Sequence, residues 1–141
     1  MCMNVEHFIK VYTELNRDNL DLVTSIYHPD IEFQDPAHKL NGLSALLGYF
    51  RGLYSNVSSC QFNIFNVDIV EDKAYLMWEM TYSHPKLNHK KPITVQGASL
   101  IRFKDGLVIY HRDFLDLGAM LYEHIPLVGN VIKALKRRMA S

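Results

Sequence analysis

The spacing of apolar residues divides the chain into a helical part and a strand-rich part. In the first part, apolar residues recur at helical spacing, and this predicts helices over Val5–Leu15, about Leu20–Tyr27 and Leu43–Tyr54. In the second part they alternate, and this predicts four strands, Gln61–Val70, Ala74–Ser83, Ile93–Phe103 and Leu107–Leu115. Residues 31–34 also alternate and predict a further strand, which breaks at Asp35-Pro36.

This order of elements predicts an α+β fold. Consecutive strands with short turns between them form a meander of antiparallel pairs. The amphipathic helices are expected to cover the concave face of the curved sheet and to leave a pocket between the layers. We expect His28-Pro29-Asp30 to end the second helix, because a residue before proline avoids the helical region.

The last residues, 117–141, extend beyond this pattern. They predict a helix over Leu117–His124, a break at Ile125-Pro126 and a second helix over Leu127–Met139. The second helix combines an apolar stripe (Val128, Val131, Ile132, Leu135 and Met139) with a basic set (Lys133, Lys136, Arg137 and Arg138). Two interpretations stay open: it packs on its own domain or a dimer mate, or it makes a weak contact with a membrane surface or an anionic partner.

Composition narrows the functional classes. A chain of 141 residues with 48% apolar and 21% charged residues suits one domain, residues 1–141. The formal net charge of zero gives no argument for nucleic acid. There is no secretory signal and no apolar run that could span a bilayer, so we expect a cytoplasmic protein. The two cysteines and seven histidines lack the spacing of a metal site, and no nucleotide-binding motif occurs, so we expect neither metal nor cofactor.

The strongest candidate for chemistry lies in the stretch Leu107–Asp116. Strand periodicity places His111 and Asp113 on one face, behind Leu107 and Ile109. Their Cα atoms would be roughly 7 Å apart, which lets the two side chains bind each other or a shared small molecule. Half-buried titratable groups that line a cavity are candidates for acid/base catalysis. The alternative is a sheet rim from which both side chains emerge into water.

Three segments carry a family resemblance, which covers about residues 4–116. They are Leu15-Asn16-Arg17-Asp18-Asn19-Leu20-Asp21, Tyr27-His28-Pro29-Asp30-Ile31-Glu32-Phe33-Gln34-Asp35-Pro36 and Ile101-Arg102-Phe103-Lys104-Asp105-Gly106. With the order of elements, they resemble the NTF2-like superfamily, in particular its SnoaL-like and ketosteroid-isomerase-like branch. The resemblance implies a cone-shaped bent sheet around a deep apolar pocket, and a homodimer that pairs through the solvent side of the sheet.

The resemblance also implies roles for individual residues. The Asp of the Asp-Pro pair is the general base of ketosteroid isomerases, which makes Asp35 the base candidate; the alternative is a turn-forming Asp. The family's tyrosine on the first helix falls at Val11, and we expect Tyr12, one position off, to point elsewhere. The family's protonated Asp on the third strand matches Ser99. The last strand resembles epoxide hydrolases and polyketide cyclases, which keeps Asp113, or less readily Asp116, as an acid/base candidate.

These features predict a cofactor-independent acid/base enzyme of isomerase, cyclase or lyase type. Its substrate would be a small apolar carbonyl compound, such as a steroid- or polyketide-like molecule. The residues predicted to catalyse are Asp35, His111 and Asp113, and those predicted to bind substrate are Phe33, Tyr54, Trp78 and Ser99. Two alternatives stay open: a non-catalytic protein that binds a small apolar ligand, and an association module that uses the sheet face and the basic tail.

Overall fold

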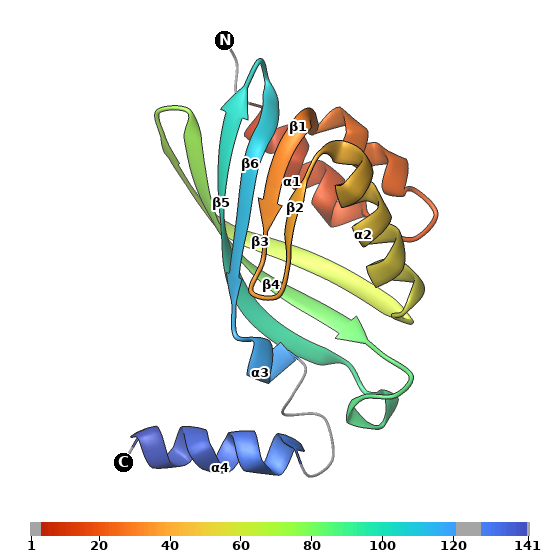
Figure 1. Cartoon of the computed structure of the whole chain (residues 1–141), viewed down its shortest axis with the longest axis vertical. Helices are drawn as coiled ribbons and strands as arrows, with labels where there is room; N and C mark the ends of the chain where they lie inside the picture. Colours follow the sequence, from red (N-terminus) through yellow and green to blue (C-terminus); the bar gives the residue numbers. More distant parts are fainter. Residues whose placement is uncertain (1–3, 121–127, 141) are drawn as a thin grey trace.

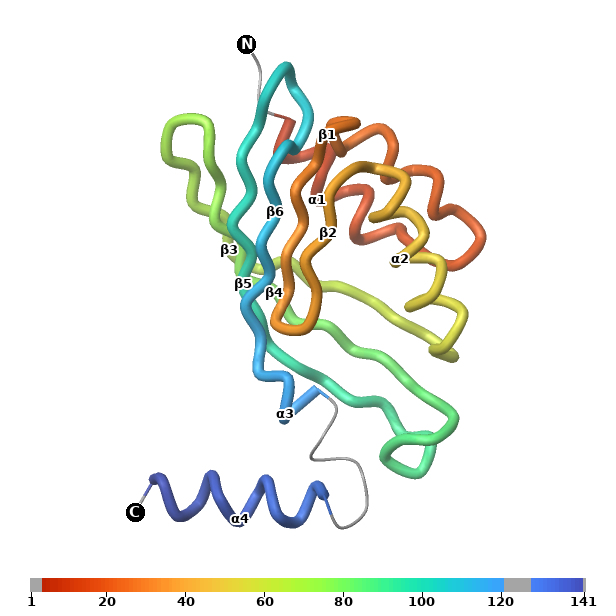
Figure 2. The backbone as a smooth tube through the Cα atoms, in the orientation of Figure 1, coloured from red at the N-terminus to blue at the C-terminus, as the bar shows by residue number. Residues whose placement is uncertain are grey.

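A single bent sheet forms the framework of the protein in this computed structural model, which describes residues 4–120 and 128–140. The strand order is β2-β1-β6-β5-β4-β3, and all neighbours are antiparallel except β1 and β6, which are parallel. The strands are β1 (Tyr27–Gln34), β2 (Lys39–Asn41), β3 (Ser59–Val70), β4 (Lys73–Ser83), β5 (Ile93–Lys104) and β6 (Leu107–Leu115). Figure 2 shows that β3, β4 and β5 bend along their length.

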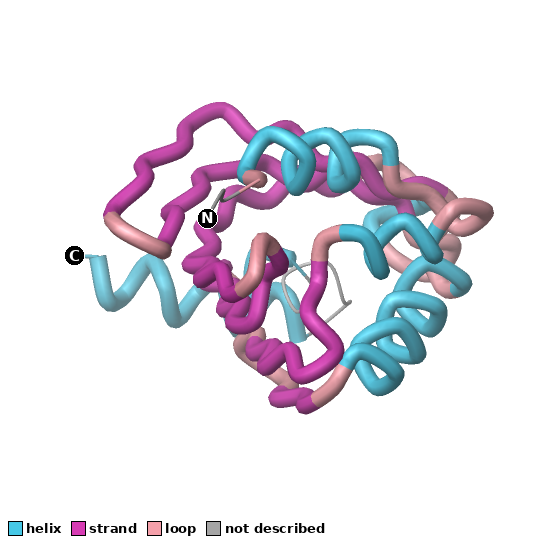
Figure 3. The backbone as a smooth tube through the Cα atoms, turned by 90° about the horizontal axis from the view of Figure 1, so that it is seen from above, coloured by secondary structure: helices cyan, strands magenta, loops and turns pink. Residues whose placement is uncertain are grey.

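The helices before β3 lie on the concave side of this sheet. They are α1 (Val5–Glu14), the 3₁₀ helix η1 (Leu20–Ser25) and α2 (Leu43–Ser55). Seen from above, the strands curve around one side of the interior and the helices close the other (Figure 3). The buried core lies between the two layers and includes Phe8, Leu46, Phe50 and Ile101. The predicted α+β cone is therefore confirmed.

The meander from β3 to β6 agrees with the alternation in the sequence, but the start of β1 does not. The second helix ends at Ser25, and Tyr27 already begins β1, although a helix was predicted up to that residue. Pro29 lies inside this strand, where the pairing of β1 with β6 is interrupted between Tyr27 and Glu32. A proline can sit there because no ladder hydrogen bond needs its missing N–H.

A β-bulge at Ile109 changes the predicted faces of β6. Val108 pairs with Phe103 and Tyr110 pairs with Arg102, so Ile109 is an extra residue on this strand. Val108 is consequently buried in the core, on the same side as His111, and the prediction that Leu107 and Ile109 share the face of His111 is wrong. The bulge precedes His111, so His111 and Asp113 still point to the same, concave face.

The described residues after β6 form the helices α3 and α4. The predicted helix over Leu117–His124 is α3 (Leu117–Met120) in its described part, and the rest lies outside the described residues. The predicted second helix is α4 (Val128–Ala140). Between β4 and β5, the loop contains the 3₁₀ turn η2 (Asn88–Lys90). No helix in the described ranges is long and apolar enough to cross a membrane.

Candidate functional site

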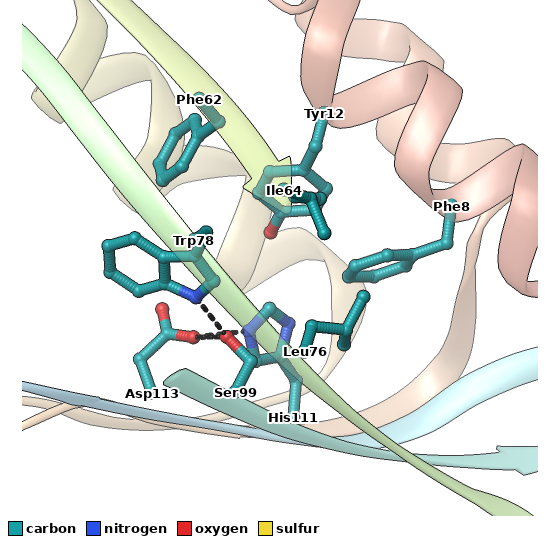
Figure 4. Close-up of a pocket in the computed structure, with 9 residues that line it drawn as sticks. All are labelled: Phe8, Tyr12, Phe62, Ile64, Leu76, Trp78, Ser99, His111 and Asp113. Carbon is teal, nitrogen blue, oxygen red and sulfur yellow. Dashed lines mark hydrogen bonds and ion pairs between the residues drawn. The ribbon is translucent and has the colours of Figure 1, made fainter. Parts of the chain in front are cut away.

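Three adjacent strands bring a hydrogen-bonded group of polar side chains to the concave face. Asp113 on β6 lies opposite Ser99 on β5, and the Ser99 hydroxyl donates to Asp113 Oδ1. His111 Nε2 lies 2.6 Å from the same oxygen. Trp78 on β4 donates from Nε1 to Ser99 Oγ at 2.8 Å. Figure 4 shows Ser99 and His111 meeting at one oxygen of the Asp113 carboxylate, with Trp78 bonded to Ser99. The two donors to Oδ1 therefore fix the position of this carboxylate.

On its other side, His111 contacts a pair of buried tyrosines. Its Nδ1 lies 2.6 Å from the Tyr27 hydroxyl, which in turn contacts the Tyr12 hydroxyl. Burial raises the pKa of both tyrosines well above the usual value, so both stay protonated at neutral pH. A neutral His111 with its proton on Nε2 satisfies every partner: Tyr12 donates to Tyr27, Tyr27 to Nδ1, and Nε2 to Asp113. The chain of hydrogen bonds thus ends on the carboxylate.

Tyr12 therefore corrects one expectation from the sequence. It was predicted to point elsewhere, yet its ring lies 6.1 Å from that of His111 and 5.5 Å from that of Phe62. The apolar face of α1 is wide enough to bury both Val11 and Tyr12. Counting positions from a family pattern does not set the rotation of a helix about its axis, and here that rotation brings Tyr12 into the site.

Asp113 lines a small cavity, and its second oxygen has no hydrogen-bond donor in the described part of the chain. Figure 4 shows this oxygen turned away from Ser99 and His111. The cavity measures about 20 Å³ and has walls formed by Phe8, Tyr12, Phe62, Ile64, Leu76, Trp78, Ser99, His111 and Asp113. This volume holds about one water molecule, whereas sites for small ligands have volumes of roughly 300–1,000 Å³. The cavity is thus far smaller than the deep pocket that the resemblance implies.

Asp35 lies just beyond the end of β1, in a different setting. Gln34 on β1 pairs with Arg112 on the parallel strand β6. Asp35 comes directly after Gln34 and Asp113 directly after Arg112, so the two carboxylates lie on the same side of the sheet. Asp35 Oδ1 accepts from the backbone N–H groups of Ala37 at 2.9 Å and His38 at 2.7 Å. The Tyr49 hydroxyl donates to Oδ2. These bonds are those of the turn-forming alternative, and Asp35 does not line the cavity.

Tyr49 connects the surroundings of the two carboxylates. Burial raises its pKa above the usual value, and the hydrogen bond to Asp35 and the charges of Asp35 and Asp113 raise it further. Phe33 lies between Tyr49 and His111, with ring centroids 5.8 Å and 4.9 Å away. The structure therefore places Phe33 in contact with His111 but outside the wall of the cavity.

The remaining predicted residues separate into two groups. Trp78 and Ser99 line the cavity, as a substrate-binding role requires. Tyr54 is buried elsewhere in the core, and its hydroxyl has no hydrogen-bond partner among the described residues. Asp116 points to the surface, where its hydrogen bond with Lys136 lowers its pKa. Asp116 therefore lies outside the site.

Two further residues of the site escaped the sequence analysis. Tyr27 was assigned to a helix, and only the parallel pairing of β1 with β6 brings it to His111. Gly97 lies opposite Trp78, and a Cβ atom there would lie 2.3 Å from Cη2 of the indole. The indole can therefore lie over this position only because residue 97 has no side chain. A glycine inside an alternating strand is the signal that could have indicated such a close approach.

The comparisons with known proteins agree with this fold. The pattern of the SnoaL-like domain matches residues 7–111, which is most of the chain, and the chain therefore belongs to this family. No curated protein sequence matches it closely enough to count as a relative. In the described ranges, no three side chains of His, Cys, Asp or Glu gather as they would around a metal ion.

Several solved structures share the architecture. One is a proposed SnoaL-like polyketide cyclase from Jannaschia sp. CCS1, with 18% identity, a TM-score of 0.73, and coverage of 84% of this chain and 88% of that one. Another is a protein with a ketosteroid isomerase-like fold from Catenulispora acidiphila in complex with trimethylamine. It has 16% identity and a TM-score of 0.72, and the match covers 85% of this chain and 92% of that one. A third is an LEH-like epoxide hydrolase from M. tuberculosis. It has 14% identity and a TM-score of 0.66, and the match covers 82% of each chain. At these identities the likeness establishes the fold alone.

Proposed function

We propose that this protein is a cofactor-independent acid/base enzyme that acts on a small apolar carbonyl compound. One observation carries the proposal. Asp113 has one oxygen held by two donors, its other oxygen has no donor among the described residues, and its side chain lines a cavity with mostly apolar walls. A carboxylate that is fixed and partly desolvated can remove a proton from a carbon next to a carbonyl group. The named activities of the structural neighbours, polyketide cyclase and epoxide hydrolase, are compatible with acid/base chemistry on this fold.

In the proposed reaction, Asp113 Oδ2 takes the proton from the carbon. The electron pair of the broken C–H bond moves toward the carbonyl oxygen and forms an enolate. Asp113 then returns the proton to this carbon or to another one, so no cofactor is consumed. His111 and Ser99 hold the carboxylate in place through Oδ1.

The enolate oxygen needs a donor, and Tyr12 provides one. Tyr12 lines the cavity at the far end of the hydrogen-bonded chain. Its O–H can turn to the substrate without breaking the bond between Tyr27 and His111. Burial raises the pKa of Tyr12, which keeps its proton available for donation. Asp35 remains in the proposal as a second carboxylate that holds the turn and Tyr49 beside the site.

A substrate larger than water needs space that the cavity does not have. The walls contributed by Phe8, Phe62 and Ile64 are side chains of α1 and β3, and these two elements face each other across the interior. We propose that α1 and β3 move apart when substrate binds. Trp78 is the only tryptophan of the chain and lines this space, so its fluorescence reports directly on occupancy.

The proposal is tested by hydrogen exchange with a set of apolar cyclic ketones in D₂O, followed by proton NMR at the carbon next to the carbonyl. We expect the wild type to speed the exchange of at least one ketone that also quenches Trp78. Tyr12→Phe should lose about 10²-fold in rate, as expected for one donor to a developing oxyanion. If no ketone exchanges faster than in buffer, the enzymatic proposal is wrong.

A non-catalytic ligand-binding protein is the second candidate. Tyr27 bonds to His111, and both His111 and Ser99 bond to Asp113. These bonds favour the second candidate, because polar side chains that are all hydrogen-bonded can have a purely structural role. In that case a ketone quenches Trp78 equally in the wild type and in Asp113→Asn, and neither protein catalyses exchange. Quenching together with exchange excludes this candidate.

We also propose that the protein forms a homodimer through the convex face of the sheet. Met77, Ala98 and Phe114 lie side by side on β4, β5 and β6, and Met77 and Phe114 are about half exposed. Phe65 and Tyr75 add further exposed apolar surface on β3 and β4. A contiguous apolar area of this kind marks an association surface. Sedimentation equilibrium should give a dimer for the wild type and a monomer for Met77→Glu; a monomeric wild type would refute the dimer.

A further inference from the structure

The inner face of the sheet has a gap at position 97. Along β5, the side chains of Val95 and Ser99 point into the interior and are buried, and residue 97 between them points the same way. Residue 97 is glycine, so the place of its side chain is left open on the concave face. Glycine inside a strand marks a site where another group approaches the backbone closely.

The indole of Trp78 fills this gap. Three atoms of its six-membered ring lie within 2.8 Å of the place that a Cβ atom of residue 97 would take. The ring is held there, because Nε1 donates to Ser99 Oγ at 2.8 Å and Phe62 packs edge-on against it with ring centroids 5.5 Å apart. Figure 4 shows the indole between Phe62 and the pair formed by Ser99 and Asp113. The indole and a side chain at position 97 therefore exclude each other.

The filled gap lies directly beside Asp113. Ser99 pairs with Asp113, and the next inward-facing pair along the same two strands is Gly97 with Leu115. In the other direction along β6, the next inward residue is His111, which is buried and already bonded to Asp113. A substrate held at Asp113 can therefore extend along the sheet only over position 97, where the indole lies.

The indole belongs to the rigid side of the cavity. β4 and β5 are inner strands that pair with a neighbour on both edges, whereas β3 is an edge strand that pairs with β4 alone. The movement of α1 and β3 proposed above thus widens the cavity toward the helices and leaves the indole in place. We propose that Trp78 sets the upper size of the substrate, so that the site accepts compact single-ring carbonyl compounds and rejects those with a second, fused ring.

The identity of the substrate as a carbonyl compound rests on the proposed function, but the filling of the gap does not. The exclusion between positions 78 and 97 offers a matched pair of variants. Trp78→Ala empties the gap, and the double variant Trp78→Ala/Gly97→Leu refills it from β5. Both variants lose the tryptophan and its bond to Ser99, so a merely structural role of Trp78 would be lost equally in both.

The first experiment measures the binding of indole, the ring that Trp78→Ala removes, by isothermal titration calorimetry. An apolar cavity of roughly 150 Å³ suffices to bind benzene, so an emptied gap should bind a ring of this kind. We expect Trp78→Ala to bind indole about tenfold or more tightly than the wild type, because an apolar ring leaves water. The double variant should bind no better than the wild type. Trp78→Leu, a milder truncation, is measured beside Trp78→Ala and replaces it if circular dichroism shows Trp78→Ala to be unfolded.

The second experiment compares hydrogen exchange of cyclohexanone, which has one ring, with that of 2-decalone, which has two fused rings. The wild type should favour cyclohexanone in kcat/KM by about tenfold or more, since a single methylene already changes this ratio by about 10–200-fold. The preference should shift toward 2-decalone by about tenfold in Trp78→Ala and return in the double variant.

The two experiments separate the size limit from the proposed function. Equal affinity of the wild type and the truncated variant for indole would overturn the size limit, and so would a double variant that binds indole as the truncated variant does. Equal exchange of both ketones by the wild type would also overturn it. Exchange of neither ketone by any of the proteins, together with the expected pattern of indole binding, would contradict the proposed function and leave Trp78 as the residue that limits the size of a bound ligand.

Discussion

Two carboxylates on the same side of the sheet have opposite surroundings. Asp35 follows β1 in a turn, and its oxygens accept from two backbone N–H groups and the Tyr49 hydroxyl. Asp113 lies within β6, where only the side chains of His111 on the same strand and Ser99 on β5 reach it, and its Oδ2 has no donor among the described residues. Because β-strands use their backbone N–H groups for the sheet, a carboxylate inside a strand depends on side chains for its partners.

This difference teaches which carboxylate is available for chemistry. A turn satisfies its own aspartate with nearby N–H groups, so the Asp-Pro pair explains Asp35 without any substrate. A strand leaves the second oxygen of Asp113 without a donor among the described residues, in a side chain that lines a mostly apolar cavity. The variants below disturb one set of surroundings and use the other as reference.

His111→Phe should have the largest effect on stability. Removing the imidazole leaves the Tyr27 hydroxyl without its acceptor and the Asp113 carboxylate with Ser99 as its remaining donor, and His111 is only 2% exposed. We expect the free energy of unfolding to fall by about 3 kcal/mol in urea titrations. The matched variant at the other carboxylate, His38→Phe, removes a half-exposed imidazole whose Nδ1 lies 3.2 Å from Asp35 Oδ1, and it should cost less than about 1 kcal/mol. Equal losses would show that the two surroundings do not differ as described.

Gly97→Ala should have the second-largest effect on stability. The new Cβ would collide with the Trp78 indole, so the ring must shift and its bond to Ser99 is lost. We expect a loss of about 2 kcal/mol in the free energy of unfolding, with a shifted emission maximum of Trp78. Gly52→Ala is the control, because no atom lies within 4 Å of a Cβ there and alanine suits a helix. An unchanged emission spectrum in Gly97→Ala would contradict the proposed close contact.

Tyr49→Phe should have a smaller effect, confined to the surroundings of Asp35. It removes the donor to Asp35 Oδ2 and should cost about 1 kcal/mol of stability. The exchange rate of a ketone substrate should stay near that of the wild type, since Asp113 keeps both of its donors. A tenfold loss of exchange in this variant would indicate that Asp35 acts in catalysis.

The smallest effect at neutral pH is expected for Tyr54→Phe, which removes a buried hydroxyl without a described partner. We expect a change of less than about 0.5 kcal/mol at pH 7. Burial raises the pKa of Tyr54 in the folded chain, so its contribution to stability is complete below about pH 10 and declines above it, where the unfolded chain ionises first. The stability of the variant should therefore decline less steeply in alkali than that of the wild type. An equally steep decline of stability with pH in both proteins would contradict a raised pKa of Tyr54 in the folded chain.

The sequence allowed the prediction of elements whose signal is local. Alternation located β3 to β6, helical spacing located α1 and α2, and the proximity of His111 and Asp113 followed from strand geometry. The three residues of β2 were missed because so short a strand carries no periodic pattern. The bulge at Ile109 was missed because one extra residue changes the facing of a strand without changing its composition.

The remaining parts of the site depend on contacts between distant segments. Tyr27 and His111 are separated by 84 positions, and a parallel pair of strands joins them. Tyr12 reaches the same cluster because of the rotation of α1 against the sheet. Side-chain packing also determines the volume of the cavity, which no pattern of apolar residues specifies.

The most direct measurement compares Asp113→Asn with Asp35→Asn in the ketone exchange assay. Both substitutions remove one negative charge and keep the shape of the side chain. We predict that Asp113→Asn lowers the exchange rate by about 10²–10⁴-fold, whereas Asp35→Asn keeps most of the wild-type rate. The opposite order, with exchange abolished in Asp35→Asn and retained in Asp113→Asn, would contradict the assignment of Asp113 as the base.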